Sequence, residues 1–223
     1  SDINTLIDIM GGDVEFCKKL DSCFFTNEKT TGRNQADVTG LIGQYCHGNE
    51  PSQHTAYLYA YYGQAYKTQE LVRQILTTLY SSKPEGICGN DDVGQMSAWY
   101  VMSAMGFYPV CPVDNQYVVA SPLFEKITIH LENGKDFVIE AKNAEKTPYV
   151  KAIKLNGQDY NKSFINYDDI KNGGKTSENI YVNLGCNYAC GGRYFCNVLA
   201  ALPQLGYWHL VLSRPFGLAY AKI

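Results

Sequence analysis

Residues 89–112 read GNDDVGQMSAWYVMSAMGFYPVCP, and within them the chain changes from a helical pattern to a strand pattern. The run Gln95–Met105 is rich in Met and Ala, and Gly106 follows it as a C-cap. Beyond Pro112 the apolar residues no longer recur at helical spacing but alternate with polar ones. The sequence therefore predicts a helical part that ends near residue 112 and a β part that begins there.

Three further helices are expected before this stretch. Asp13 is a plausible N-cap for the first, and residues 55–62 form the second. Thr68 is expected to cap the third, in which Arg73 faces solvent. The apolar stripe of that third helix consists of Leu71, Val72, Ile75, Leu76 and Leu79.

Short strands are expected after residue 112. Residues 126–131 alternate polar and apolar side chains, residues 132–135 supply a turn, and residues 136–141 return as the second strand of a hairpin. Residues 149–155 continue the pattern, which is typical of a β-sandwich-like unit. The predicted segments are thus 1–112, 113–175 and an atypical tail, 176–223, to which no structure is assigned.

Composition narrows the function classes. The formal charge of the 223 residues is −3, without the basic cluster that nucleic-acid binding requires, so nucleic acid is not an expected partner. No apolar run reaches the roughly 18 residues of a membrane span. Eighteen tyrosines would suit a sugar-binding cleft, although most are expected to pack in the core. The eight cysteines form no Cys-x-x-Cys pair, which leaves disulfides of a secreted protein or plain buried thiols.

Two loops before helices collect the chemically active groups. The first loop, residues 47–54, reads HGNEPSQH, and the second loop, residues 89–92, reads GNDD. Helix N-termini favour carboxylates, so one interpretation makes Asp91 and Asp92 mere helix caps. The repetition of a Gly-Asn-acid loop favours instead a shared cleft that contains three carboxylates, the third being Glu50.

A cluster of carboxylates has two chemical uses. Oxygen-rich sites without thiols suit calcium, which takes six to eight oxygen ligands. Paired carboxylates also hydrolyse glycosidic bonds, and an inverting site holds them about 6.5 to 9.5 Å apart to admit a water. The pattern of residues alone leaves both uses open.

The stretch GLIGQYCHGNEPSQHTAYLYAYYGQAYKTQELVRQIL, residues 40–76, together with residues 89–112, closely resembles the C-terminal part of glycoside hydrolase family 92. Members of this family are calcium-dependent, inverting exo-α-mannosidases. The likeness runs from about residue 2 to residue 175. It implies an α+β fold in which residues 1–112 are the closing helices of an (α/α)6 barrel and a β-sandwich-like portion follows.

The resemblance also implies roles for particular residues. Glu50, with Asn49 near it, would hold Ca²⁺, and the ion would grip mannose hydroxyls O2 and O3. Asp92 would be the general base that activates water, assisted by Asp91 or Asn90. The residues expected near the sugar are His47, His54, Asn90 and Trp99.

This chain departs from the family pattern in three places. Gln53 stands where the family usually has a histidine, and the tail after residue 175 does not follow the family. The motif of the proton-donating glutamate would precede Ser1, so we expect the missing N-terminal part of the same enzyme to supply it. Loss of a general acid typically lowers rates about 10²–10⁴-fold, so the isolated fragment should be an impaired enzyme.

The sequence-based hypothesis is hydrolysis of terminal α-linked mannose from glycans, including N-glycans, by an inverting, calcium-assisted mechanism in a secreted or periplasmic protein. Mannose-containing glycans are the expected partners. The alternative is a non-catalytic module that binds carbohydrate or calcium.

Overall fold

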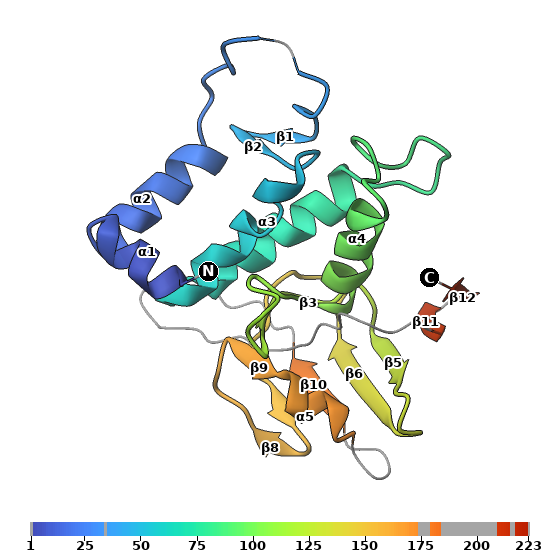
Figure 1. Cartoon of the computed structure of the whole chain (residues 1–223). Coiled ribbons are helices and arrows are strands. Elements are labelled where there is room, and N and C mark those ends of the chain that lie inside the picture. Colours follow the sequence, from blue (N-terminus) through green and yellow to red (C-terminus); the bar gives the residue numbers. More distant parts are fainter. Residues whose placement is uncertain (1, 34, 174–178, 184–208, 215–216, 223) are drawn as a thin grey trace.

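The computed structural model describes residues 2–33, 35–173, 179–183, 209–214 and 217–222, and in it helices lie above a group of strands (Figure 1). The fold is therefore a mixture of helix and sheet. The helical elements are α1 (Ile3–Ile9), α2 (Asp13–Phe24), the 3₁₀ helices η1 (Glu50–Ser52) and η2 (Thr55–Tyr62), α3 (Ala65–Thr78), α4 (Gln95–Met105) and α5 (Tyr167–Lys171).

The strands form four small sheets. The largest has the order β10-β6-β5-β11-β12, and β10 runs parallel to β6 while the other pairs are antiparallel. A second sheet has the order β3-β4-β9, and β1-β2 and β7-β8 are separate hairpins. Their bounds are β1 (Leu41–Ile42), β2 (Tyr45–Cys46), β3 (Phe107–Tyr108), β4 (Gln116–Val119), β5 (Lys126–His130), β6 (Asp136–Lys142), β7 (Lys154–Leu155), β8 (Gln158–Asp159), β9 (Phe164–Asn166), β10 (Asn179–Asn183), β11 (His209–Arg214) and β12 (Gly217–Lys222).

Strong local signals are confirmed. Helix α4 has the predicted bounds, and Gly106 ends it in the left-handed conformation, at a φ of 99°. The hairpin of β5 and β6 pairs Lys126 with Glu140 and His130 with Asp136, as the alternating pattern predicts. Most of the tail lies outside the described residues, among it Cys186, Cys190 and Cys196.

Three details of the helices differ from expectation. The N-cap of α2 is Gly12 rather than Asp13. Thr68 lies inside α3, where its buried hydroxyl donates to the Ala56 carbonyl at 2.9 Å instead of capping the helix. Residues 55–62 form the tighter 3₁₀ helix η2, in which five successive residues are buried. Packing on every side, rather than one apolar stripe, determines that segment.

Arg73 does not face solvent, and the prediction that it would is wrong. Its half-buried guanidinium donates to the carbonyls of Ala144 and Pro122, both at 2.8 Å, and to Ser121 Oγ at 2.9 Å. Nearby on α3, the buried Gln69 Oε1 accepts from the Val150 N–H at 3.0 Å. Helix α3 is therefore joined to the β part by hydrogen bonds that periodicity cannot reveal.

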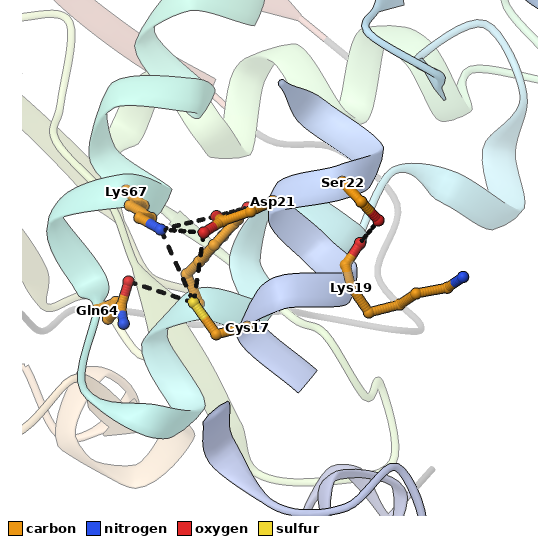
Figure 2. A network of polar contacts seen from close by, with 7 residues as sticks. Cys17, Lys19, Asp21, Ser22, Gln64 and Lys67 are labelled. Atoms are coloured by element: carbon orange, nitrogen blue, oxygen red, sulfur yellow. Dashed lines mark hydrogen bonds and ion pairs between the residues drawn. The ribbon is translucent and has the colours of Figure 1, made fainter. Parts of the chain in front are cut away.

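A polar network joins α2 to η2 and α3 (Figure 2). Lys67 Nζ lies 2.7 and 2.8 Å from the two carboxylate oxygens of Asp21, and Tyr59 donates to the same carboxylate at 2.9 Å. The Cys17 thiol lies 3.8 Å from Lys67 Nζ and 3.6 Å from Gln64 Oε1. Because the ion pair is partly shielded from water, it fixes α2 against α3.

None of the helices in the described part of the chain combines the length and the hydropathy that a membrane crossing needs.

Candidate active site

The first and second loops meet at the end of the helical layer that faces away from the strands, beside the β1-β2 hairpin (Figure 1). A Cβ added to Gly89 would lie 3.3 Å from the Cα of Gly48 and 2.9 Å from Thr39 Oγ1. A Cβ on Gly48 would overlap the same hydroxyl. Because only glycine permits this approach of one backbone to another, these two positions let the loops share one site.

Asp92 sits on an unusual backbone. Its φ is 49°, and the next two residues, Val93 and Gly94, also have positive φ values of 57° and 94°. The left-handed region is disfavoured for a β-branched residue such as valine, whose side chain here is fully exposed. Strained backbone of this kind is often found at functional sites.

The electrostatic surroundings of Asp92 distinguish it from the other carboxylates. Partial burial raises the pKa of Asp92 above its ordinary value, and the negative charges of Glu50, Asp37 and Asp91 raise it further. Within the described residues, the Asp92 carboxylate has no hydrogen bond that would offset this repulsion. Asp92 therefore lies within the electrostatic influence of Glu50, which belongs to the other loop.

Asp91 has the geometry of a helix cap. One of its carboxylate oxygens accepts from the Ser97 N–H at 3.0 Å and from the Ser97 hydroxyl at 2.8 Å. Its own carbonyl accepts from the Met96 N–H at 3.2 Å. The N-cap residue of α4 is Gly94, so neither aspartate is the N-cap itself. Asp91 nevertheless binds the first turn of α4 as a capping side chain does, whereas Asp92 does not.

His47 lies behind the first loop and is fully buried. Its two ring nitrogens lie 2.8 Å from the Tyr45 hydroxyl and 2.7 Å from the Tyr80 hydroxyl. Burial lowers the pKa of His47 to about 4, so the ring is neutral at pH 7. In this position the ring supports the loop from inside.

The pKa of His47 predicts a loss of stability in acid. The unfolded chain binds a proton near pH 6.5, whereas the fold resists protonation down to about pH 4. The stabilisation is therefore complete above pH 6.5 and lost as the pH falls to about 4, by about 3 kcal/mol at most. Urea unfolding at pH 7 and pH 4.5 measures this difference.

The matched variants are His47→Asn and His130→Asn. His47→Asn should remove most of the loss of stability between pH 7 and pH 4.5. Burial also lowers the pKa of the half-buried His54, which should account for the rest of that loss. His130 is exposed on the β part beside Asp136, and its replacement should leave the loss of stability in acid unchanged. If His47→Asn lost as much stability in acid as the unchanged protein, His47 would not be the cause of that loss.

Trp99 is also fully buried, although the sequence placed it near a sugar. Its Nε1–H donates to the Gln53 carbonyl at 3.1 Å, and its ring centroid lies 4.4 Å from that of His47. Gln53 is buried beside it, and its side-chain amide donates to the His47 carbonyl at 3.3 Å. Gln53, which stands where the family usually has a histidine, thus packs in the interior beneath the first loop.

The remaining predicted residues lie nearer the surface. Asn49 and His54 are half-buried, and Glu50 and Asn90 are exposed. Sequence reasoning missed two residues here, Asp37 and Thr39, which precede the β1-β2 hairpin. Their only sequence signal is a polar run before Gly40, because their role depends on the approach of the second loop.

The oxygen atoms of the two loops are of the kind that calcium binds, but the side chains present do not form a complete set of ligands. Glu50, Asp37, Asp91 and Asp92 provide oxygen ligands and a negative field, as calcium prefers. Across the described ranges, however, no three His, Cys, Asp or Glu side chains converge at ligand distance. Calcium bound here would need additional oxygen ligands, such as water, backbone carbonyls or groups of another segment.

Comparisons with known proteins extend these observations. The family model described as glycosyl hydrolase family 92 catalytic domain matches residues 1–179. A curated relative, an uncharacterized secreted glycosidase of Arthroderma benhamiae, is 28% identical over 177 residues, which cover 78% of this chain and 21% of that protein.

Solved structures show the same likeness. The family GH92 alpha-mannosidase BT3965 of Bacteroides thetaiotaomicron, in complex with mannoimidazole, is 39% identical with a TM-score of 0.73, over 82% of this chain and 23% of that chain. The family GH92 inverting mannosidase BT2199 of the same organism is 40% identical with a TM-score of 0.68, over 82% and 25%. The chain spans about a quarter or less of the length of these relatives.

Proposed function

Because this chain belongs to glycosyl hydrolase family 92, we propose that it forms part of an enzyme that removes terminal α-linked mannose from glycans. The observation that carries the proposal is the close approach of the two loops at Gly48 and Gly89, which brings Asp92 under the influence of the Glu50 charge. We place residues 1–112 among the closing helices of an (α/α)6 barrel and residues 113–175 in a β-sandwich portion.

Asp92 is the proposed general base. A carboxylate whose pKa is raised is a better proton acceptor than an ordinary one. It would take a proton from the water that attacks the anomeric carbon from the face opposite the leaving group, which inverts the configuration. Asp91 acts through the backbone, by holding the second loop on α4.

Glu50 and Asn49 are the residues that would hold calcium. The ion, when bound, supplies a positive charge that binds two sugar hydroxyls. His54 and Asn90 lie at the surface of the two loops and are proposed to contact the sugar. His47 and Trp99, which are buried, would position the first loop from behind.

The proton donor is proposed to come from a segment outside this chain. Leaving-group protonation is worth about 10²–10⁴-fold, so the isolated chain should hydrolyse α-mannosides poorly. The curated relative is described as secreted, and we propose a secreted or periplasmic location for this protein as well.

Calcium binding tests the proposal in the chain itself. We expect calorimetric titration to detect calcium binding that weakens at least about 10-fold in Glu50→Gln, because a carboxylate ligand of the ion is lost. The change in affinity should be measured with and without mannose.

Glu132→Gln is the matched control, because Glu132 is an exposed carboxylate in the turn of the β part. It should bind calcium as the unchanged chain does. Equal calcium affinity in all three proteins would remove Glu50 from the metal site. Binding of calcium and mannose by a full-length protein that hydrolyses no α-mannoside would instead support the non-catalytic module.

A further inference from the structure

Two cysteines stand at the bases of the two loops, and neither takes part in the proposed hydrolysis. Cys46 ends β2, directly before the first loop, and Cys88 directly precedes the second loop. We propose that Cys46 and Cys88 form a disulfide that joins the two loops covalently. The proposal rests on geometry and holds whichever reaction the site performs.

Both cysteines are free thiols in the structure, and their sulfur atoms lie beside neighbouring residues of the segment 37–40. Cys46 Sγ lies 3.4 Å from the Thr39 carbonyl oxygen and 3.0 Å from that of Asp37. Cys88 Sγ fills the space beside Gly40 in which a Cβ would stand. Gly40 has a φ of 62°, and any side chain at this position would overlap the Cys88 sulfur.

The backbones on either side are close as well. Gly48 is two residues after Cys46 and Gly89 is one residue after Cys88, and a Cβ added to Gly89 would lie only 3.3 Å from the Cα of Gly48. A disulfide needs a Cα separation of about 4.4 to 6.8 Å, which neighbouring segments in such contact can supply. Burial raises the pKa of the Cys88 thiol, and the nearby Cys46 raises it further, as expected for sulfurs that are near each other.

The chemistry requires a disulfide as oxidant, either a small molecule such as oxidised glutathione or a protein thiol-disulfide oxidoreductase. One cysteine thiolate attacks the incoming disulfide and releases one thiol, and the second cysteine then attacks the mixed disulfide and releases the other. The Cys46–Cys88 bond forms as the incoming sulfur–sulfur bond breaks. The two cysteines lose two electrons and two protons, which the two released thiols carry.

Such a bond would act on the site directly. It closes a loop of about 40 residues that contains η2 and α3, which restricts the unfolded chain. It also fixes the base of the loop that bears Glu50 to the base of the loop that bears Asp92. Disulfides persist in oxidising compartments such as the extracellular space. The curated relative of this chain is described as secreted.

Peptide mapping without reductant tests the proposal on the unchanged chain. The protein is equilibrated with oxidised and reduced glutathione, free thiols are alkylated, and the digest is analysed by mass spectrometry. We expect a linked pair of peptides that contain Cys46 and Cys88 and that separates on reduction. Reduction should also lower the melting temperature, by roughly 10 °C.

Cys46→Ser should abolish both the linked peptide and the effect of reduction on melting. Cys23→Ser is the matched control, because Cys23 is half-buried as Cys46 is, and it should leave both in place. Alkylation of Cys46 and Cys88 in the oxidised protein, or a bond from either to another cysteine, would overturn the proposal. Mapping of the unchanged chain decides this even where a variant does not fold.

Discussion

Replacement of Asp92 by asparagine should lower kcat/KM on an α-mannoside by about 10²–10⁴-fold and at the same time raise the melting temperature. The rate falls because an amide cannot accept the proton of the attacking water. Stability rises because the substitution removes a carboxylate that is repelled by Glu50, Asp37 and Asp91 and has no hydrogen bond among the described residues. The rate is measured on the full-length enzyme with a chromogenic α-mannoside.

The gain in stability should depend on pH in a defined direction. The fold raises the pKa of Asp92, so its contribution to stability is complete below the ordinary aspartate pKa of 3.8 and is lost as the pH rises through the folded value. The variant should therefore melt higher than the unchanged protein at neutral pH, and the two should converge in acid.

Asp91→Ala provides the contrast. It removes the acceptor for Ser97, so it should lower the free energy of unfolding by about 0.5–2 kcal/mol. If Asp92→Asn destabilised the protein to that extent and left kcat/KM unchanged, both aspartates would be helix caps and the proposed base would be refuted.

Trp99→Ala should lower the free energy of unfolding by about 3–5 kcal/mol. The indole is fully buried, contacts His47 and stacks on Tyr80 at a centroid separation of 6.0 Å and an interplanar angle of 7°. The substitution leaves a cavity beneath the first loop and deprives the Gln53 carbonyl of its donor. Urea unfolding with a constant m-value would give the difference directly.

Tyr66→Ala is the control for loss of an aromatic ring, because Tyr66 is 41% exposed on α3 and should change stability far less. The same pair of variants tests the role that the sequence assigned to Trp99. If Trp99→Ala left stability unchanged but abolished mannose binding, Trp99 would be a sugar-contacting residue.

The predictability of the fold depended on how local each signal was. The β5-β6 hairpin and the end of α4 at Gly106 follow from alternation and from turn chemistry, which a few adjacent residues determine. The inward position of Arg73 could not be predicted in this way, because its acceptors lie about 50 to 70 residues away in the sequence. Nor could the 3₁₀ form of η2, which burial on all sides determines.

The candidate site was predictable in part for the same reason. Repetition of a glycine, an asparagine and an acid marked both loops, and the structure brings these loops into contact. Which aspartate is a cap required the distances to Ser97, and the presence of Asp37 required the long-range approach of a third segment. The family resemblance suggested that Trp99 lies near the sugar, whereas the indole is fully buried.

The hydrogen bonds that cross residue 112 bear on how such a chain is inherited. Arg73 binds the main-chain carbonyls of Pro122 and Ala144, and Gln69 binds the main-chain N–H of Val150. Main-chain groups are present whatever the side chain, so the β part can diverge at these positions without losing its partners. Replacement of the β part by a domain of another fold would remove these carbonyls and leave the half-buried guanidinium of Arg73 without acceptors. The two parts should therefore be transmitted together, free to vary in sequence but not to be shuffled.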